Sequence, residues 1–507
     1  MNKVTYLSLF FFIISNISFS QSIDDSFSQI KMQKDLEIFR NIRLKANSGL
    51  YKYRTKEQID SIYNWAEKEI NNLSTYIDFY NLISTLTDYE GSLHNNTFFP
   101  EKRFETIKKE YIGYFPFPVK IVENKVLLNF QTSEIPLGAE IVSINALEIN
   151  DIIPNTYKFY TTDGINKTGK QIGINGSFSK YYRYLFGLEN EFKITFKTKS
   201  SDTKKTIIVK GVGYSDYRKN FKNRHSKPFD RLQYEDPNED EIYNYKQINK
   251  NTAVLTVNSF DIGGNEEAAE HKIYKNWLDS IFVNIKKNGI KNLIVDVRNN
   301  GGGTDPNDVI TYSYLTSRKF QESKQVWINF KKIPLLKYYD SPIPAFLRPL
   351  GVGKFNRYFQ KRFPTEKNGK YFISKETNEM KVRKPNKNAF TGNIYLLISP
   401  RVASAGSLFS AMVAGNQNTI TIGEETMGGY YGHNGHTSFE YILPKSKIAT
   451  EFSIDNIEQD VPKKPNQFYN RGTIPDYNVT QTYEDYLNQK DTQMDFTLNL
   501  IKKNDLE

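Results

Sequence analysis

The sequence predicts a mixed α/β fold with parallel strands, and three stretches carry this prediction. Residues 253–257, 293–297 and 394–398 are short runs of bulky apolar residues, as expected of strands that are buried on both faces. Amphipathic or helix-like stretches follow them, at 268–287, at 309–315 and from Ala405 onward. Strands that alternate with helices in this way indicate parallel α/β layering.

The remaining elements divide the chain into further parts. Apolar residues recur at helical spacing over 23–86, so we expect a helical segment over 21–112. Residues 113–212 read as a small β domain and 213–250, which is charged and short of aliphatic residues, as a linker. The β domain is predicted from strands at 119–122, 125–130, 135–145, 192–196 and 206–209, with a helix at 149–159.

The α/β core would then occupy residues 251–507, ending in a helix at 491–503. It carries an insertion over 316–389, in which basic and aromatic residues are interleaved. An insertion of this length is often a functional lid. A membrane-surface patch and a purely decorative loop remain equal alternatives.

Composition excludes several classes of function. A chain of 507 residues exceeds one compact core, so two to four domains are expected. The net charge of +11 is spread along the chain without a dominant Lys/Arg block, which argues against a nucleic-acid partner. The absence of cysteine excludes disulfides, thiol catalysis and thiolate metal sites.

The first twenty residues have the pattern of a secretory signal. Lys3 precedes an apolar run over 4–14, and the small residues Ser18 and Ser20 stand before Gln21. The run is too short to span a bilayer, and no later segment is apolar enough for a transmembrane helix. We therefore expect an exported protein, periplasmic or secreted, whose signal is cleaved near Ser20/Gln21.

Ser404 lies where the strand at 394–398 gives way to a helix. A helix N-terminus offers free backbone N–H groups and the positive end of the helix dipole, which suit a serine nucleophile whose attack creates an oxyanion. The N–H of Ala405 would be one donor to that oxyanion. The alternative is that Ser404 only caps the helix.

Four stretches in order resemble the carboxy-terminal processing (tail-specific) serine peptidases and their tricorn-core relatives. They are residues 293–303, 402–406, 423–428 and 472–476. A PDZ-like segment with Pro136-Leu-Gly-Ala precedes them, and the resemblance covers roughly residues 80–500. It implies a crotonase/ClpP-like core of ββα units and hydrolysis of peptide bonds in polypeptide tails without a cofactor.

The resemblance also implies site residues. It places the nucleophile at Ser404, and an oxyanion hole at the N–H of Ala405 and of one glycine in 301–303, with Gly302 favoured by alignment. Gly429 stands where some members have a catalytic lysine, so a serine–lysine dyad is not expected. His94 matches the histidine of tricorn-like members and would act as the general base.

The residue that would orient His94 stays open. Tyr469 stands where tricorn-like members have a glutamate, and Leu93 where they have a serine. Glu90, Asp88 or the Tyr469 hydroxyl are the alternatives. Because a triad without its orienting group loses much of its rate, two other functions are kept. They are a catalytically inactive peptide- or ligand-binding relative and a serine esterase on the same core.

His433 and His436 form a short His-x-x-His motif in a loop rich in Gly, Tyr and Asn. No acidic residue stands at the offset of a helical zinc motif. We therefore expect both histidines to line the substrate site and expect no metal site.

Overall fold

The computed structural model describes residues 22–265, 267–343 and 347–505. The predicted signal at 1–20 lies outside these ranges. Within them, no helix combines the length and the apolar character needed to cross a membrane.

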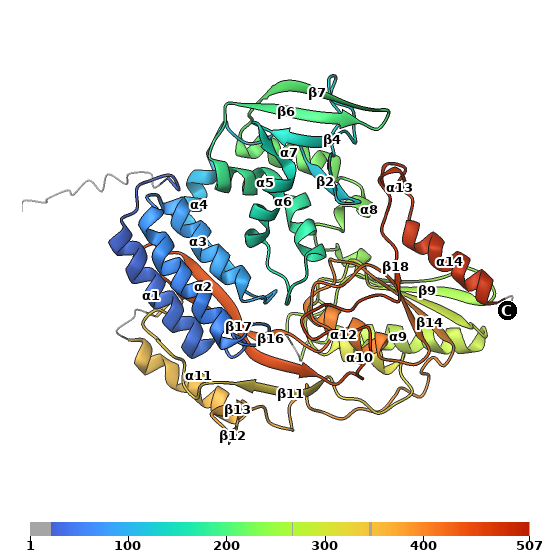
Figure 1. Ribbon diagram of the computed structural model, residues 1–507. Coiled ribbons are helices and arrows are strands. Elements are labelled where there is room, and N and C mark those ends of the chain that lie inside the picture. Colours follow the sequence, from blue (N-terminus) through green and yellow to red (C-terminus); the bar gives the residue numbers. More distant parts are fainter. Residues whose placement is uncertain (1–21, 266, 344–346, 506–507) are drawn as a thin grey trace, which may run out of the picture.

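The N-terminal helices are α1 (Gln29–Ala46), α2 (Lys56–Glu69) and α3 (Tyr76–Tyr89), and they lie within the segment predicted to be helical (Figure 1). Thr55 and Thr75 begin the second and third helices with capping boxes, in which each threonine accepts from the third helical N–H. The buried faces of these helices share one apolar core with an antiparallel sheet. The loop after α3 carries His94.

This antiparallel sheet has the strand order β1-β17-β11-β13-β12, and β16 also pairs with β17. Its strands are β1 (Asn96–Phe98), β11 (Ser323–Ile328), β12 (Thr365–Lys367), β13 (Lys370–Phe372), β16 (Asn434–Ile442) and β17 (Ala449–Gln459). Three of these strands and α11 (Arg348–Arg362) come from the insertion at 316–389. The insertion is therefore partly built into a sheet.

The predicted parallel sheet is present, in the order β18-β15-β14-β10-β9-β8. Its strands are β8 (Tyr243–Gln247), β9 (Thr252–Val257), β10 (Asn292–Asp296), β14 (Asn393–Ile398), β15 (Thr419–Gly423) and β18 (Tyr477–Asn478). All neighbours run parallel except β8, which is antiparallel to β9.

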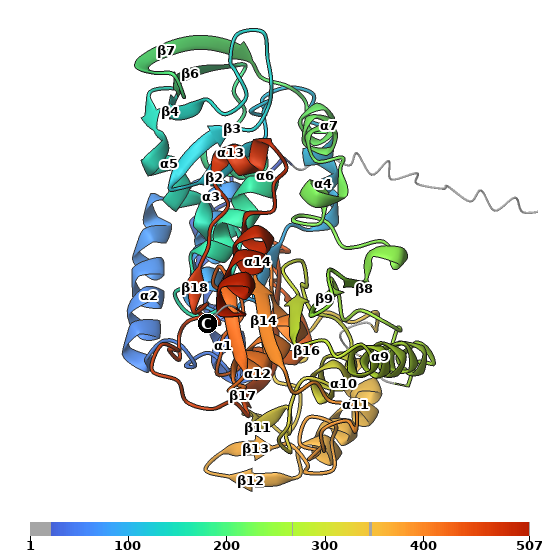
Figure 2. The same cartoon turned by 90° about the vertical axis from the view of Figure 1, so that its right-hand side faces the viewer.

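Helices cover both faces of the parallel sheet. Leu255 and Leu396 face α9 (Glu270–Lys287), α10 (Asn307–Ser313) and α12 (Ser404–Ala414), whereas Val254 and Leu397 face α14 (Thr492–Asn504) (Figures 1 and 2). Successive side chains of a strand point to opposite faces, so a strand covered on both sides must be apolar throughout. This explains the nearly continuous runs of apolar residues from which the strands were predicted.

A third sheet, at the top of Figure 1, has the order β2-β3-β4-β6-β7, with β5 on β4. Its strands are β2 (Val119–Val122), β3 (Lys125–Leu128), β4 (Glu140–Ile144), β5 (Leu147–Glu148), β6 (Glu191–Thr198) and β7 (Ser201–Lys210). Two helices, α5 (Ile149–Thr156) and α6 (Thr168–Phe186), pack on it and close a separate apolar core.

The segment expected as a linker is more ordered than the sequence indicated. It forms α7 (Tyr214–Arg224), α8 (Pro228–Arg231) and β8, the edge strand of the parallel sheet. Most of its apolar groups are aromatic, and Tyr217 and Phe221 are buried. Large aromatic side chains can thus anchor a segment that aliphatic residues do not mark.

Candidate active site

Ser404 is the first residue of α12, directly after the turn that follows β14. Its backbone has φ +49°, a left-handed conformation that costs a non-glycine residue about 1–2 kcal/mol. The N-cap position belongs to Ala403, and no side chain caps this helix end. Ser404 is therefore not a capping residue, and the first N–H groups of α12 are left without a side-chain acceptor.

A cavity of about 310 Å³ brings the predicted residues together. Ser404, Ala405, His94, His433 and His436 all line it. The remaining lining residues are Gly303, Thr304, Asp305, Tyr358, Arg362, Leu408, Thr437, Ser438 and Ser453. Tyr358 and Arg362 belong to α11, so the insertion forms part of the cavity wall.

The His94 loop is held in place by a carboxylate that the sequence did not single out. The Asp163 side chain accepts from the N–H of Leu93 at 3.0 Å and from the N–H of Gly429 at 2.8 Å. It thereby joins the loop before β1 to the loop before β16. Burial raises the pKa of Asp163 to about 7.

His94 itself is neutral at pH 7. Burial, with a smaller contribution from His436, lowers the pKa of His94 to about 4. Its Nε2 is buried and has no hydrogen-bond partner among the described residues. A neutral imidazole with an unengaged nitrogen can accept a proton, which is the property that a general base requires.

His433 lies against His94. The two ring centroids are 5.4 Å apart with the planes inclined by 43°. His433 is 1% exposed, and its Nδ1 is buried without a hydrogen-bond partner among the described residues. Burial, followed by the nearby His94 and His436, keeps the pKa of His433 well below its usual value.

Gly302 lies so close to Ser404 and Ala405 that a side chain would not fit there. A Cβ on this residue would lie 2.7 Å from the Ser404 Cβ and 3.2 Å from the Ala405 nitrogen. However, its N–H already donates to Asn300 Oδ1 at 2.9 Å. This bond argues against Gly302 as an oxyanion donor, whereas the next glycine, Gly303, lines the cavity and its N–H has no acceptor among the described residues.

Glu90 does not contact His94. Its carboxylate is buried and lies 3.3 Å from the Arg43 guanidinium, and it accepts hydrogen bonds from Asn47 and Asn95. Its role in the structure is to neutralise a buried arginine.

The other two alternatives for an orienting group also lie elsewhere. Tyr469 is 49% exposed and stacks on Tyr431, and it is not among the residues that line the cavity. Asp88 forms an ion pair with Lys170. Among the described residues, His433 is therefore the aromatic ring in contact with His94.

Comparison with known proteins agrees with the architecture around this cavity. The chain resembles two solved structures, mature CPAF complexed with lactacystin and mature CPAF, each at 13% sequence identity. The first has a TM-score of 0.59 over 94% of this chain and 98% of that chain, and the second 0.57 over 90% and 94%. At this identity the likeness concerns the fold.

Comparison with curated protein sequences gives no match. The description of peptidase family S41, in contrast, matches residues 251–479, which include Ser404 and the Gly301–Gly303 turn. This match confirms the resemblance to the tail-specific serine peptidases that the four motifs indicated. Residues 251–479 of the chain are thus similar to peptidase family S41.

Proposed function

We propose that the protein is a serine endopeptidase that hydrolyses peptide bonds in polypeptide tails, with Ser404 as nucleophile and His94 as general base. The observation that carries the proposal is that these two side chains, from opposite halves of the sequence, line one cavity. The match of residues 251–479 to S41 supports the reaction class, since S41 is a peptidase family.

In this mechanism, the Ser404 Oγ attacks the carbonyl carbon of the substrate while His94 takes the hydroxyl proton. The carbonyl oxygen becomes an oxyanion. It would accept hydrogen bonds from the N–H groups of Ala405 and Gly303, with Gly303 in place of the expected Gly302. His94 then gives its proton to the leaving amine, the C–N bond breaks, and water releases the acyl group from Ser404 by the reverse steps.

His433 is the residue we propose to position His94. The two buried rings lie against each other, and His433 Nδ1 has no hydrogen-bond partner among the described residues. In this proposal His433 pairs with the Nδ1 of His94, which leaves the His94 Nε2 free to take the proton of Ser404. A hydrogen bond from a second imidazole would fix the orientation and tautomer of the base, as a carboxylate does elsewhere. His433→Asn is expected to slow the reaction and change its pH profile, and His433→Ala to slow it further.

The other parts of the chain have proposed roles as well. Residues 113–212, a small antiparallel sheet with two helices, would be the PDZ-like domain that delivers a polypeptide tail. Residues 21–112 would carry the base, and residues 251–507 would form the crotonase/ClpP-like core. Because α11 contributes to the cavity wall, the insertion at 316–389 would contact the substrate. Export rests on the signal-like residues 1–20.

The proposal is tested with a fluorophosphonate probe, which reacts with activated serines. Labelling of the full chain should disappear in Ser404→Ala and in His94→Ala, together with cleavage of an unstructured polypeptide substrate. If the unaltered protein is not labelled but still binds peptide, it is a binding relative. If it turns over esters but cleaves no peptide, it is an esterase.

A further inference from the structure

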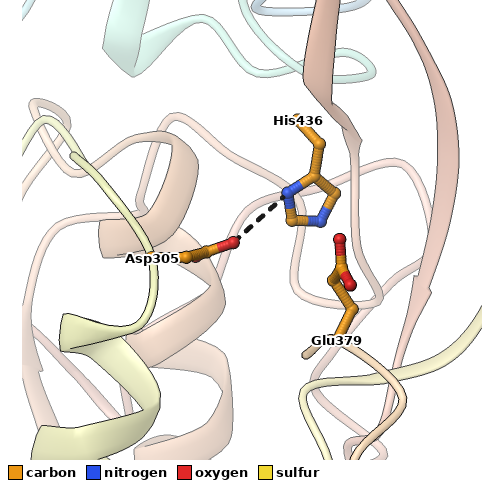
Figure 3. A group of neighbouring side chains, drawn as sticks. All are labelled: Asp305, Glu379 and His436. Carbon is orange, nitrogen blue, oxygen red and sulfur yellow. Dashed lines mark ion pairs between the residues drawn. The ribbon is translucent and has the colours of Figure 1, made fainter. Parts of the chain in front are cut away.

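Acidic side chains and one histidine converge on a single region beside the Ser404 cavity. Candidate ligand atoms of Asp305, Glu379 and His436 lie within 4.8 Å of one another, and Figure 3 shows the three side chains directed toward a common space. A second group, Asp305, Asp308 and Glu322, meets the same distance limit. Asp305 belongs to both groups, so the five residues form one cluster.

The cluster is assembled from segments that are far apart in the sequence. Asp305 and Asp308 stand at the start of α10, and Glu322 directly precedes β11. Glu379 comes from the insertion, and His436 from β16. The short spacing between His433 and His436 therefore gave no hint of it, because the two histidines have different neighbours.

Several carboxylate oxygens of the cluster are buried without a hydrogen-bond partner among the described residues. Asp308 is fully buried, and Glu322 and Glu379 are 1% and 2% exposed. Neither oxygen of Asp308 receives a hydrogen bond from another side chain, and Glu322 Oε1 and Glu379 Oε2 have no hydrogen-bond partner among the described residues. Groups that are buried in this way need compensation, because an isolated ionised carboxylate away from water is strongly destabilising.

Two arginines supply positive charge to the four carboxylates, and one of them, Arg383, acts on Asp308 and Glu322 through its charge. Arg362 pairs with Glu379, and the His436 nitrogens lie 3.6 Å from Asp305 and from Glu322, longer than direct hydrogen bonds. The four carboxylates of the cluster thus have too little positive charge around them to be neutralised.

We propose that Asp305, Asp308, Glu322, Glu379 and His436 form a binding site for a divalent cation. Carboxylate oxygens together with one imidazole are ligands that Mn²⁺ and Zn²⁺ accept, whereas Ca²⁺ prefers oxygen alone. The bound ion would fasten the insertion, through Glu379, to α10 and β16. Because Asp305 and His436 also line the cavity, the ion would hold one wall of it in place.

This inference concerns binding and does not depend on the proposed peptidase reaction. The test uses the full chain after treatment with EDTA and dialysis, titrated with MnCl₂, ZnCl₂ and CaCl₂ in an isothermal calorimeter. Saturable binding of Mn²⁺ or Zn²⁺ is expected, with affinity about tenfold or more above that for Ca²⁺. Glu322→Gln and Asp308→Asn should each weaken the binding by about tenfold or more.

Asp460→Asn is the matched control, since Asp460 forms a surface ion pair with Arg318 and is not among the cluster residues. Its affinity should equal that of the unaltered protein. Thermal unfolding provides a second readout. Mn²⁺ should raise the Tm of the unaltered protein and of the control, but not that of the cluster variants.

Two results would overturn the proposal. One is the absence of saturable binding by the unaltered protein. The other is that Glu322→Gln and Asp308→Asn, folded by circular dichroism, bind the ions as the control does. A rise in Tm of these variants without any response of the unaltered protein to metal would mean that protons neutralise the cluster.

Discussion

Replacing one of two adjacent glycines tests whether the close contact between the glycine turn and Ser404 controls the reactivity of the nucleophile. Gly302 has φ +114° and lies against Ser404, whereas a Cβ on Gly301 would meet no atom within 4 Å. Gly302→Ala and Gly301→Ala therefore add the same methyl group to neighbouring positions of one turn. Only the first addition should disturb the nucleophile.

The expected magnitude follows from the distances. The new Cβ would lie 2.7 Å from the Ser404 Cβ, and ordinary contacts begin at 3.4 Å, so the two must separate by about 0.7 Å. A displacement close to 1 Å at a reacting group costs about 10²-fold in rate, or about 2.7 kcal/mol in the barrier. The unfavourable φ would also lower the free energy of unfolding by about 1–3 kcal/mol.

The assay is the second-order rate constant for labelling by a fluorophosphonate, measured on variants whose folding has been verified by near-ultraviolet circular dichroism. Gly301→Ala should label at the rate of the unaltered protein and Gly302→Ala about 100 times more slowly. If folded Gly302→Ala labels within threefold of Gly301→Ala, the contact between the glycine turn and Ser404 does not govern reactivity, and the reasoning fails.

Three further predictions concern ionisable groups. Glu90→Ala should lower the free energy of unfolding in urea by about 3–5 kcal/mol, because it leaves the Arg43 guanidinium buried without its carboxylate, and a loss under 1 kcal/mol would contradict the ion pair. The labelling rate should stay level from pH 7 to about pH 5 and fall to half near pH 4, since protonated His94 cannot act as a base, whereas a midpoint near 6.5 would show that the imidazole is not desolvated. His225 is 4% exposed, and burial lowers its pKa to about 3. Between about pH 3 and the unfolded pKa of about 6.5, the unfolded chain therefore binds one more proton than the folded chain. Through this histidine, the free energy of unfolding falls as the pH falls in that range. The His225→Gln variant lacks this contribution, and its curve of unfolding free energy against pH should differ from that of the unaltered protein by about 1.4 kcal/mol per pH unit in this window; parallel curves would refute the assignment.

Much of the fold was predictable because a strand that is buried on both faces has a recognisable sequence pattern, a run of apolar residues. The run at 394–398 is apolar throughout and that at 293–297 is apolar except for Asp296, and the structure places both strands between two layers of helices. In contrast, β17, at 11 residues the longest strand, was not predicted. Its buried positions include Thr450, Asp455 and Asn456, which read as polar in sequence. These polar residues are interspersed with the buried Phe452, Ile454 and Ile457 and so interrupt the apolar pattern by which a buried strand is found in a sequence.

At the candidate site, the sequence determined which residue types stand at the turn before α12 and in the glycine run, because local backbone geometry depends on neighbouring residues. Ser404 and Ala405 follow from such a local pattern. The choice between Gly302 and Gly303 does not follow from it, because that choice depends on which glycine N–H donates to the Asn300 side chain. Likewise, Glu90 was a candidate partner of His94 until its contact with Arg43 was seen.

The sequence by itself determined the layered α/β core, the family motifs and the two residues proposed for proton transfer and attack, since each leaves a pattern within a short stretch. Only the tertiary structure decided that His433 lies against His94, that Asp163 joins two loops, and that acidic residues from distant segments meet His436. These contacts join residues from distant parts of the chain. They arise when separate layers pack, and no spacing along the chain encodes them.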